Sequence, residues 1–178
     1  MARKTERIGR SGEYLVCSVI ARESDTVTVM PHTSHADVIF EWKSKLYRCQ
    51  VKTVTHIEAK YKNWRFDIRK GRTTTGRHYK KNQIDIVAMV NLKYQTICFR
   101  AFCDCQTTQI TIKDEIMKST NSIQSFKDAM RSIILATNGR QDKNDSTFGN
   151  EKTVKNGWFM RVGPLAQLVE QFPFKYFF

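Results

Sequence analysis

The chain has 178 residues, of which 40% are hydrophobic, and its 30 Lys and Arg against 17 Asp and Glu give a formal charge of +13. That length and apolar content suffice for one domain with a core. So large a positive charge is tolerated mainly beside a polyanion, because contacts to phosphates release condensed counterions, so we expect nucleic acid ahead of an anionic membrane surface. No apolar run approaches bilayer-spanning length and no apolar export segment follows MARKTERIGR, so we expect an intracellular protein without membrane association.

The five cysteines are odd in number, contain no CxxC pair and fall mostly within apolar runs, which indicates reduced thiols rather than a disulfide framework. His32 with His35, or Cys103 with Cys105, would offer two zinc ligands, but neither pair has a matching second pair. We therefore expect no zinc site.

The first predicted element is a helix from residue 9 to about residue 22, capped by Ser11. Its inward face is marked by spacings of three and four, at Glu13, Val16, Cys17 and Ile20. The next three segments, TVTVMP, HADVIFEW and LYRCQVKT, have the composition of strands, and WRFDIRK has the alternation of an exposed strand. IDIVAMVNL and TICFRAF are continuous apolar runs, which predicts strands covered on both faces. The last predicted element is an amphipathic helix in SIQSFKDAMRSIIL. This order predicts an α/β fold of three layers, with a mixed central β-sheet flanked by helices.

A change of composition after residue 136 divides the predicted core, residues 1–136, from the rest of the chain. Residues 137–157 are dense in Asn, Gly, Asp and Lys, which is typical of a loop or linker. The last residues, GPLAQLVEQFPFKYFF, combine a short helical pattern with an aromatic end. We expect residues 137–178 to form a polar loop and a C-terminal appendage.

Polar side chains mark one end of the predicted hairpin formed by HADVIFEW and LYRCQVKT. If Lys43 and Ser44 form a two-residue turn, the register places Asp37 directly opposite Gln50, with Lys52 further along the same face. A three-residue loop would shift the register by one and remove this opposition. In the first register, a carboxylate and an amide oxygen could hold one cation.

Magnesium suits such a pair because it prefers hard oxygen ligands and keeps several waters. It lowers the pKa of a bound water, and Lys52 beside it could orient the nucleophile or stabilise the charge of the transition state. The structural alternative is that Asp37 merely begins a strand, while Gln50 and Lys52 lie on the solvated face of an edge strand.

Glu13 favours the metal site over that alternative. A carboxylate on the inward face of a helix is costly unless it is paired or bound to metal. Its own alternative is a glutamate near the helix start, stabilised by the helix dipole close to Ser11.

Together these residues resemble the motif of a known family. GE in a first helix, an Asp that opens a strand and QVK that closes the next resemble the PD-(D/E)XK nuclease superfamily over roughly residues 9–102. Within it the chain is most similar to intron-encoded PD-(D/E)XK homing endonucleases, with archaeal-type Holliday junction resolvases next. The resemblance implies a restriction-endonuclease-like core and hydrolysis of phosphodiester bonds in double-stranded DNA with Mg²⁺, for which Mn²⁺ substitutes.

The resemblance also implies catalytic roles for Glu13, Asp37, Gln50 and Lys52. Asp37, Gln50, Glu13 and the backbone carbonyl of Val51 would hold the metal, and Lys52 would assist the attacking water. Gln50 stands where the motif has its second acidic residue, and a neutral amide is a weaker magnesium ligand than a carboxylate. The homing branch tolerates glutamine here, but an inactivated nuclease that only binds DNA stays open.

A basic segment, residues 60–81, carries nine Lys or Arg against one acid, Asp67. We predict a DNA-binding hairpin lying along a groove, while the aromatic Phe66 and Tyr79 belong to the core. The residues expected to contact DNA are Arg10, Lys60, Lys62, Arg65, Arg69, Lys70, Arg72, Arg77, Lys80 and Lys81.

The sequence thus predicts a metal-dependent, site-specific endonuclease of cytoplasmic, bacterial, phage or organellar origin. Cutting both strands of a duplex requires two sites, so a homodimer or homotetramer is expected. A Holliday junction resolvase is the alternative enzyme, and a non-catalytic DNA-binding protein is the alternative from another class.

Overall fold

A computed structural model describes residues 3–58, 60–70, 78–80 and 82–145, with side chains as far as residue 137. In chain order its elements are α1 (Lys4–Ile20), β1 (Thr26–Val29), β2 (Val38–Trp42), β3 (Lys45–Val54), β4 (Asn63–Asp67), β5 (Ile86–Asn91), β6 (Thr96–Ala101), the 3₁₀-helix η1 (Phe102–Asp104), β7 (Gln109–Lys113), α2 (Asp114–Ser119) and α3 (Ser122–Asp145). None of the helices in these described ranges is long and apolar enough to cross a membrane.

The central sheet has five strands in the order β1-β2-β3-β5-β6. The pairs β1–β2, β2–β3 and β5–β6 are antiparallel, whereas β3 and β5 are parallel, so the sheet is mixed as predicted. All six residues of β5 are buried, because this strand has a neighbour on each side and a layer on each face. The expectation that TICFRAF is covered on both faces holds only in part: Ile97 and Phe99 lie in one core and Cys98 packs against the other, but Arg100 is exposed to solvent.

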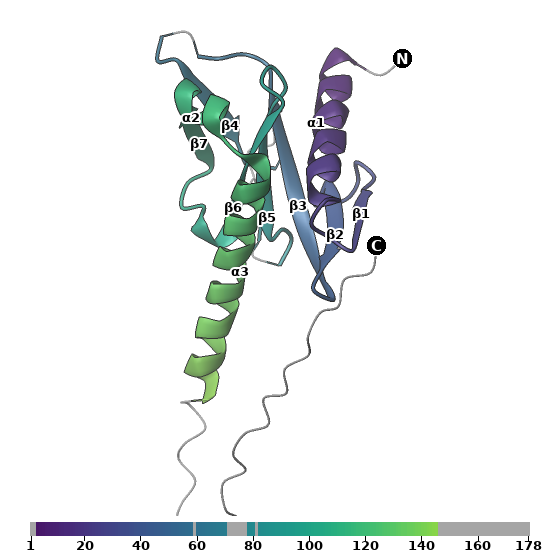
Figure 1. The fold of residues 1–178 in the computed structure, drawn as a ribbon, viewed down its shortest axis with the longest axis vertical. Coiled ribbons are helices and arrows are strands. Elements are labelled where there is room, and N and C mark those ends of the chain that lie inside the picture. The colour runs from purple at the N-terminus through teal and green to yellow at the C-terminus, as the bar shows by residue number, and fades with distance from the viewer. Residues whose placement is uncertain (1–2, 59, 71–77, 81, 146–178) are drawn as a thin grey trace, which may run out of the picture.

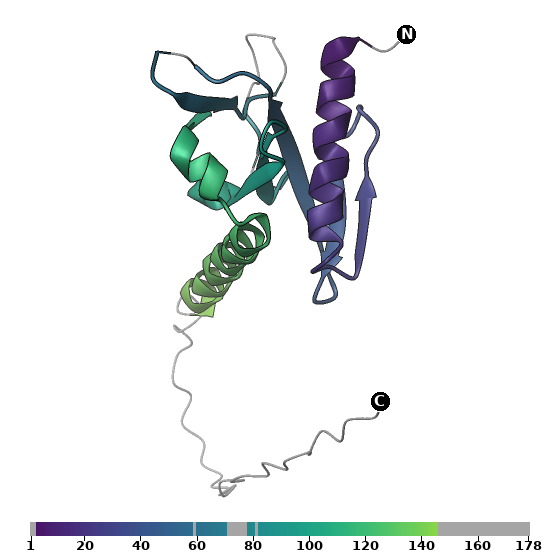
Figure 2. The same cartoon turned by 45° about the horizontal axis from the view of Figure 1, so that its top comes forward.

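Two hydrophobic cores lie on opposite faces of this sheet, which gives three layers (Figure 1). On one face, α1 and α3 pack against the sheet through residues such as Val16 and Phe126. On the other, Val87 and Met89 of β5 pack against a two-stranded sheet, β4–β7, and against Met117 of α2. The predicted fold class is confirmed, and one outer layer includes this small second sheet (Figure 2).

Both long helices extend beyond their predicted limits. Helix α1 begins at Lys4, with Arg3 as its N-cap, so the expectation that Ser11 caps it is wrong. Residues 4–8 lack an apolar stripe but are mostly good helix formers, which continue the helix outward from its packed part. Helix α3 likewise continues to Asp145, so residues 137–145 are helical rather than a loop. The division at residue 136 and the appendage beyond it stay predictions.

Within the segment predicted as a hairpin, residues 60–81, the described strand β4 makes a long-range pairing. Strand β4 pairs antiparallel with β7, from Asn63↔Lys113 to Asp67↔Gln109, and with no strand among the described residues of its own segment, from which 71–77 and 81 are excluded. Neither β7 nor α2 was expected from the sequence. The alternating apolar residues Ile110 and Ile112 of β7 were the available strand signal.

Candidate functional site

The β2–β3 turn sets the register of the site. Lys43 and Ser44 have φ of 52° and 59°, as a two-residue turn of type I′ requires, and Trp42 pairs with Lys45. This confirms the predicted turn. Regular pairing ends at Val38↔Cys49, and the Asp37 N–H donates to the Cys49 carbonyl at 2.9 Å rather than continuing the ladder to the next pair.

Asp37 nevertheless meets Gln50, as the predicted register required. Its Oδ2 accepts hydrogen bonds from the Val51 N–H at 2.7 Å and from Nε2 of Gln50. The Asp37 carboxylate therefore occupies the edge of β3 at the place where β2 stops pairing. Burial raises the pKa of Asp37, while the bond from Val51 and the nearby charge of Lys52 oppose that rise.

Gln50 lies inside the protein and not on an edge strand. Only 7% of Gln50 is exposed, and β3 lies between β2 and β5, so the solvated-edge alternative is wrong. Its amide group directs NH₂ toward Asp37. For Gln50 Oε1 to share a cation with that carboxylate, the amide has to turn over.

Lys52 is a half-buried amine beside Asp37. Its Nζ donates to the Arg69 carbonyl at 3.2 Å and lies 5.8 Å from the centroid of the Tyr79 ring. Burial lowers the pKa of Lys52, and the charges of Asp37 and Asp67 act against that decrease. In the parallel register of β3 and β5, Gln50 pairs with Val87 and Lys52 pairs with Met89. Val87 and Met89 pack against β4 and β7, so the side chains of Gln50 and Lys52 face the same layer.

Glu13 reaches the same region from α1. It is 7% exposed and lies well inside a helix that starts at Lys4, so the helix-start alternative is wrong. Burial raises the pKa of Glu13, Asp37 raises it further, and Arg10 and His32 lower it. Arg10 is the counter-ion, with Nη1 2.9 Å from Glu13 Oε2. Glu13 is thus coupled to Asp37 electrostatically.

Two neighbours of the site were not expected from the sequence. His32 lies 3.3 Å from Nη2 of Arg10 and its charge acts on both carboxyl groups of the site, although the sequence offered it only as a zinc ligand. Tyr79 packs against the second core, as predicted, and in addition both Lys52 and Lys70 lie over its ring. Burial raises the pKa of Tyr79, and the charge of Asp37 adds to that rise. Only the tertiary structure brings these residues to the site.

The donors at the site fit a magnesium ion in their chemistry. No three His, Cys, Asp or Glu side chains cluster as a metal site within the described ranges. The two carboxylates, Asp37 and Glu13, therefore need the Val51 carbonyl, the Gln50 amide oxygen and water to complete a set of hard oxygens. Both carboxyl groups have raised pKa values because of burial, and a bound cation would favour their charged forms.

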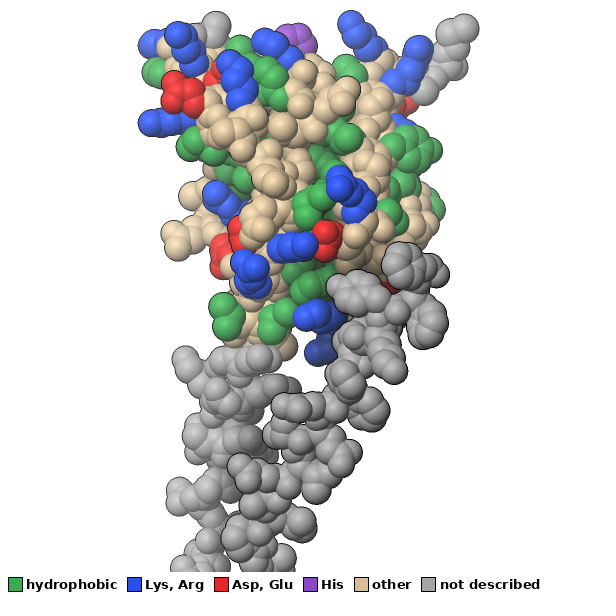
Figure 3. All heavy atoms as spheres, viewed as in Figure 1, with side chains coloured by type: hydrophobic (Ala, Val, Ile, Leu, Met, Phe, Trp, Pro, Cys, Tyr) green, Lys and Arg blue, Asp and Glu red, His purple; other side chains and the backbone are tan. Residues whose placement is uncertain are grey.

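The predicted DNA-contacting residues fall into several places. Arg10 is tied to Glu13, and Arg69 is tied to Asp67 by an ion pair. Lys60, Lys62, Arg65 and Lys70 are exposed, or partly so, in β4 and close to it in sequence. Lys80 is exposed in the segment before β5, where it lines a pocket with His35 and Arg48. Arg72, Arg77 and Lys81 lie outside the described residues. Figure 3 shows Lys and Arg side chains along the upper edge of the molecule, the edge at which α1 begins and β3 ends in Figure 1.

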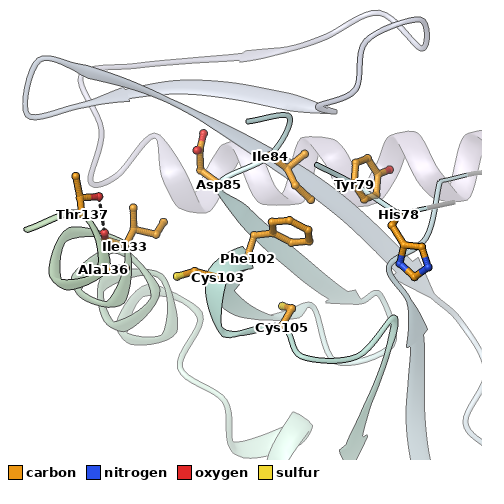
Figure 4. A pocket seen from close by; sticks show the side chains of 10 residues that line it. All are labelled: His78, Tyr79, Ile84, Asp85, Phe102, Cys103, Cys105, Ile133, Ala136 and Thr137. Atoms are coloured by element: carbon orange, nitrogen blue, oxygen red, sulfur yellow. Dashed lines mark hydrogen bonds between the residues drawn. The ribbon is translucent and has the colours of Figure 1, made fainter. Parts of the chain in front are cut away.

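A cavity of about 360 Å³ lies beside the site, between η1, α3 and the segment before β5 (Figure 4). Tyr79 and Asp85 both line it. Asp85 is held by Arg48, whose Nε and backbone N–H donate to Asp85 Oδ2 at 3.0 and 2.8 Å. Together with the bond from the Asp85 N–H to the Arg48 carbonyl at 2.8 Å, this pairing ties the residue before β5 to β3.

Comparisons with known proteins give a likeness of fold. No protein-family model matches the chain, and no curated protein matches its sequence. Among solved structures, that of the bacterial homing endonuclease I-Ssp6803I matches with a TM-score of 0.56 and 17% identity, covering 79% of this chain and 99% of the other. At such identity the match shows a shared fold, and it extends over nearly the whole of that endonuclease.

Proposed function

We propose that this chain is a metal-dependent endonuclease that hydrolyses phosphodiester bonds in double-stranded DNA, as a site-specific homing enzyme of the PD-(D/E)XK type. One observation carries the proposal: Asp37, Gln50 and Lys52 meet where β2 leaves β3, with the buried Glu13 coupled to them. The likeness of fold to a homing endonuclease and the charge of +13 support it.

Each residue of the site has a distinct part in this proposal. Glu13, Asp37, Gln50 and the Val51 carbonyl would hold Mg²⁺ or Mn²⁺, which when bound supplies charge neutralisation and lowers the pKa of water. Asp37 is oriented for this by the Val51 N–H. Water adds to phosphorus, the P–O bond to the leaving sugar breaks, and the products are a phosphate monoester and a hydroxyl.

Lys52 would act on the attacking water and on the transition state. Its ammonium is fixed by the Arg69 carbonyl and by Tyr79, so it requires little reorganisation to hydrogen-bond a reacting oxygen. Because burial lowers its pKa, the amine gives up a proton more readily than an exposed lysine does. Two such sites are needed to cut both strands, so the proposal includes a symmetric homodimer or homotetramer.

The proposal is tested by incubating the protein with linear duplex and four-way junction DNA, in Mg²⁺ and in Ca²⁺. Asp37→Asn and Lys52→Met are compared with wild type, and Lys93→Met, which changes an exposed lysine over Tyr94, is the matched control. We expect Mg²⁺-dependent cleavage by wild type and Lys93→Met, and retained binding without cleavage by the two site variants.

Other outcomes select the alternatives. Preferential cutting of the junction identifies a resolvase. Salt-dependent DNA binding without cleavage in any metal identifies a binding protein. Residual cleavage that is equal in wild type, Asp37→Asn and Lys52→Met excludes this site as its source.

A further inference from the structure

The outward face of the β4–β7 sheet is lined entirely by polar side chains. In both strands the apolar residues point inward, with Trp64 and Phe66 of β4 opposite Ile112 and Ile110 of β7. The alternate positions point outward and form three cross-strand pairs: Asn63 with Lys113, Arg65 with Thr111, and Asp67 with Gln109. We call these six residues the ribbon face.

The ribbon face has hydrogen-bonding groups that the fold does not use. Within the described ranges, the side chains of Arg65, Thr111 and Lys113 are exposed and take part in no hydrogen bond or ion pair. Asp67, the one acid, is already neutralised by Arg69. The face therefore presents net positive charge and free donors, without apolar side chains that would suit a protein partner.

One end of the ribbon face adjoins the candidate active site. Lys52 donates to the carbonyl of Arg69, two residues beyond the end of β4, and the charges of Lys52 and Asp67 act on each other. From Asp67 the face runs outward to Arg65 and Asn63. A five-residue strand spans about 14 Å, the length of roughly four stacked base pairs.

These dimensions fit a DNA groove. The major groove is about 12 Å wide and admits a two-stranded β-ribbon, whose outward side chains then face the base edges. Arg pairs with the guanine edge, Asn with the adenine edge and the Thr methyl with thymine. The central cross-strand pair, Arg65 and Thr111, combines two of these groups at one level of the ribbon.

We infer that the ribbon face of β4–β7 lies in the major groove of double-stranded DNA and reads bases within a few base pairs of the cleaved phosphate, with Arg65 and Thr111 at its centre. This inference rests on the proposed function. It goes beyond it by naming a surface for sequence readout, of which only Arg65 was expected from the sequence to touch DNA.

The test is selection of bound and cleaved duplexes from a randomised library, carried out with the full-length protein. Wild type is compared with Arg65→Ala and with Thr111→Ser, which removes the methyl group of Thr111 and keeps its hydroxyl. Arg22→Ala, an exposed arginine beyond the end of α1, is the matched control. Urea unfolding of each variant verifies that the fold is intact.

We expect Arg65→Ala to reduce discrimination at one or two adjacent base pairs by on the order of 10- to 100-fold. Thr111→Ser should weaken a preference for thymine at the same or the neighbouring base pair, since Arg65 and Thr111 face each other, and Arg22→Ala should leave preferences unchanged. Affinity for unrelated DNA should fall much less than affinity for the selected sequence.

Three results would overturn the inference. If Arg65→Ala weakens binding to all sequences equally and lowers the salt dependence by about one phosphate contact, Arg65 holds the backbone and does not read bases. If wild type cleaves duplex DNA without sequence preference at these positions, the inference fails while the proposed function stands. If wild type neither binds nor cuts duplex DNA, both fail.

Discussion

Gly12 of α1 lies so close to Thr53 of β3 that a Cβ on Gly12 would fall 1.9 Å from Thr53 Oγ1. Helix and strand can approach to this degree only because residue 12 has no side chain. The next residue is Glu13, the helix carboxylate that is coupled to Asp37. The Gly12–Thr53 contact therefore sets how near α1 brings its carboxylate to the end of β2.

Gly12→Ala is expected to push α1 away from β3. The overlap should destabilise the protein by about 1–3 kcal/mol despite the better helix propensity of alanine. Displacement of Glu13 should reduce cleavage by on the order of 10- to 100-fold. Urea unfolding and single-turnover cleavage measure the two effects.

Gly9→Ala is the control, because a Cβ there meets nothing within 4 Å. It should stabilise the protein by about 0.5–1 kcal/mol and leave cleavage unchanged. Combining Gly12→Ala with Thr53→Ala, which removes the atom nearest to the new Cβ, should restore part of the stability that Gly12→Ala loses. Equal effects of the two glycine substitutions would contradict the close contact.

Gln50→Glu is expected to tighten metal binding and weaken the metal-free fold. A second carboxylate would lie next to Asp37, whose pKa is already raised by burial. The Mg²⁺ concentration for half-maximal cleavage should fall about tenfold, since a carboxylate is a stronger ligand than an amide.

The stability of Gln50→Glu is measured in EDTA at neutral pH, where it should be lower than that of wild type by about 1–3 kcal/mol. Gln95→Glu, an exposed change in the β5–β6 turn, serves as the control and should alter neither quantity. Unchanged Mg²⁺ dependence in Gln50→Glu would remove residue 50 from the metal site.

Without metal, the stability of the protein should fall as pH rises above about 4. Burial raises the pKa of Asp37 and of Glu13. A carboxyl group whose pKa is higher in the folded protein stabilises the fold below its ordinary value of about 4, and this contribution is lost as pH rises through the folded pKa. In the proposed site Mg²⁺ would bind the charged forms, so its addition should offset the loss.

Urea unfolding between about pH 4 and 7, in EDTA and in Mg²⁺, measures this effect. Asp37→Asn should have a flatter pH profile than wild type in EDTA. Hydrogen bonds from Arg69 and Lys118 lower the pKa of Asp67 and Asp114, respectively, to about 2, so these groups act in the opposite direction and below pH 4. A profile that is identical in wild type and Asp37→Asn would rule out the raised pKa of Asp37.

Replacing Lys43-Ser44 by Asn-Gly should stabilise the protein by about 0.5–1 kcal/mol. Both residues have positive φ, which Asn and Gly adopt at lower cost in a type I′ turn. The urea midpoint should increase and cleavage should be unchanged, since the register stays the same. Lys45→Asn, one residue later in β3, is the control and should not stabilise the protein. If the Asn-Gly replacement does not stabilise the protein either, the assignment of a type I′ turn is wrong.

The contrast between this turn and β4 explains which parts of the fold could be predicted. The β2–β3 register depends on a two-residue turn and on alternation of side chains, so Asp37 and Gln50 could be brought together from residues 37–50 alone. Strand β4 pairs with a strand more than 40 residues later, and no local pattern specifies that partner. The basic segment was therefore predicted to pair with itself.

The prediction of the start of helix α1 and of the surroundings of the site failed for a related reason. The apolar stripe of α1 starts near Gly9, but Lys, Glu and Arg extend the helix back to Lys4 without any inward face. Glu13 could be placed on the inward face from its spacing. Arg10 lies three residues before Glu13 on the same helix, so the spacing alone was a signal for this ion pair. The position of His32 beside Arg10 depends on where the β1–β2 connection lies, which periodicity does not indicate.

The proposed chemistry and the proposed readout occupy separate stretches of the chain. Glu13, Asp37, Gln50 and Lys52 lie in one continuous segment, α1 to β3, whereas the ribbon face is assembled from β4 and β7. Exposed residues at alternate positions of that ribbon contribute nothing to either core. In a protein with the proposed function, target preference can therefore change through one outward side chain at a time, while the segment proposed to carry the hydrolysis stays the same.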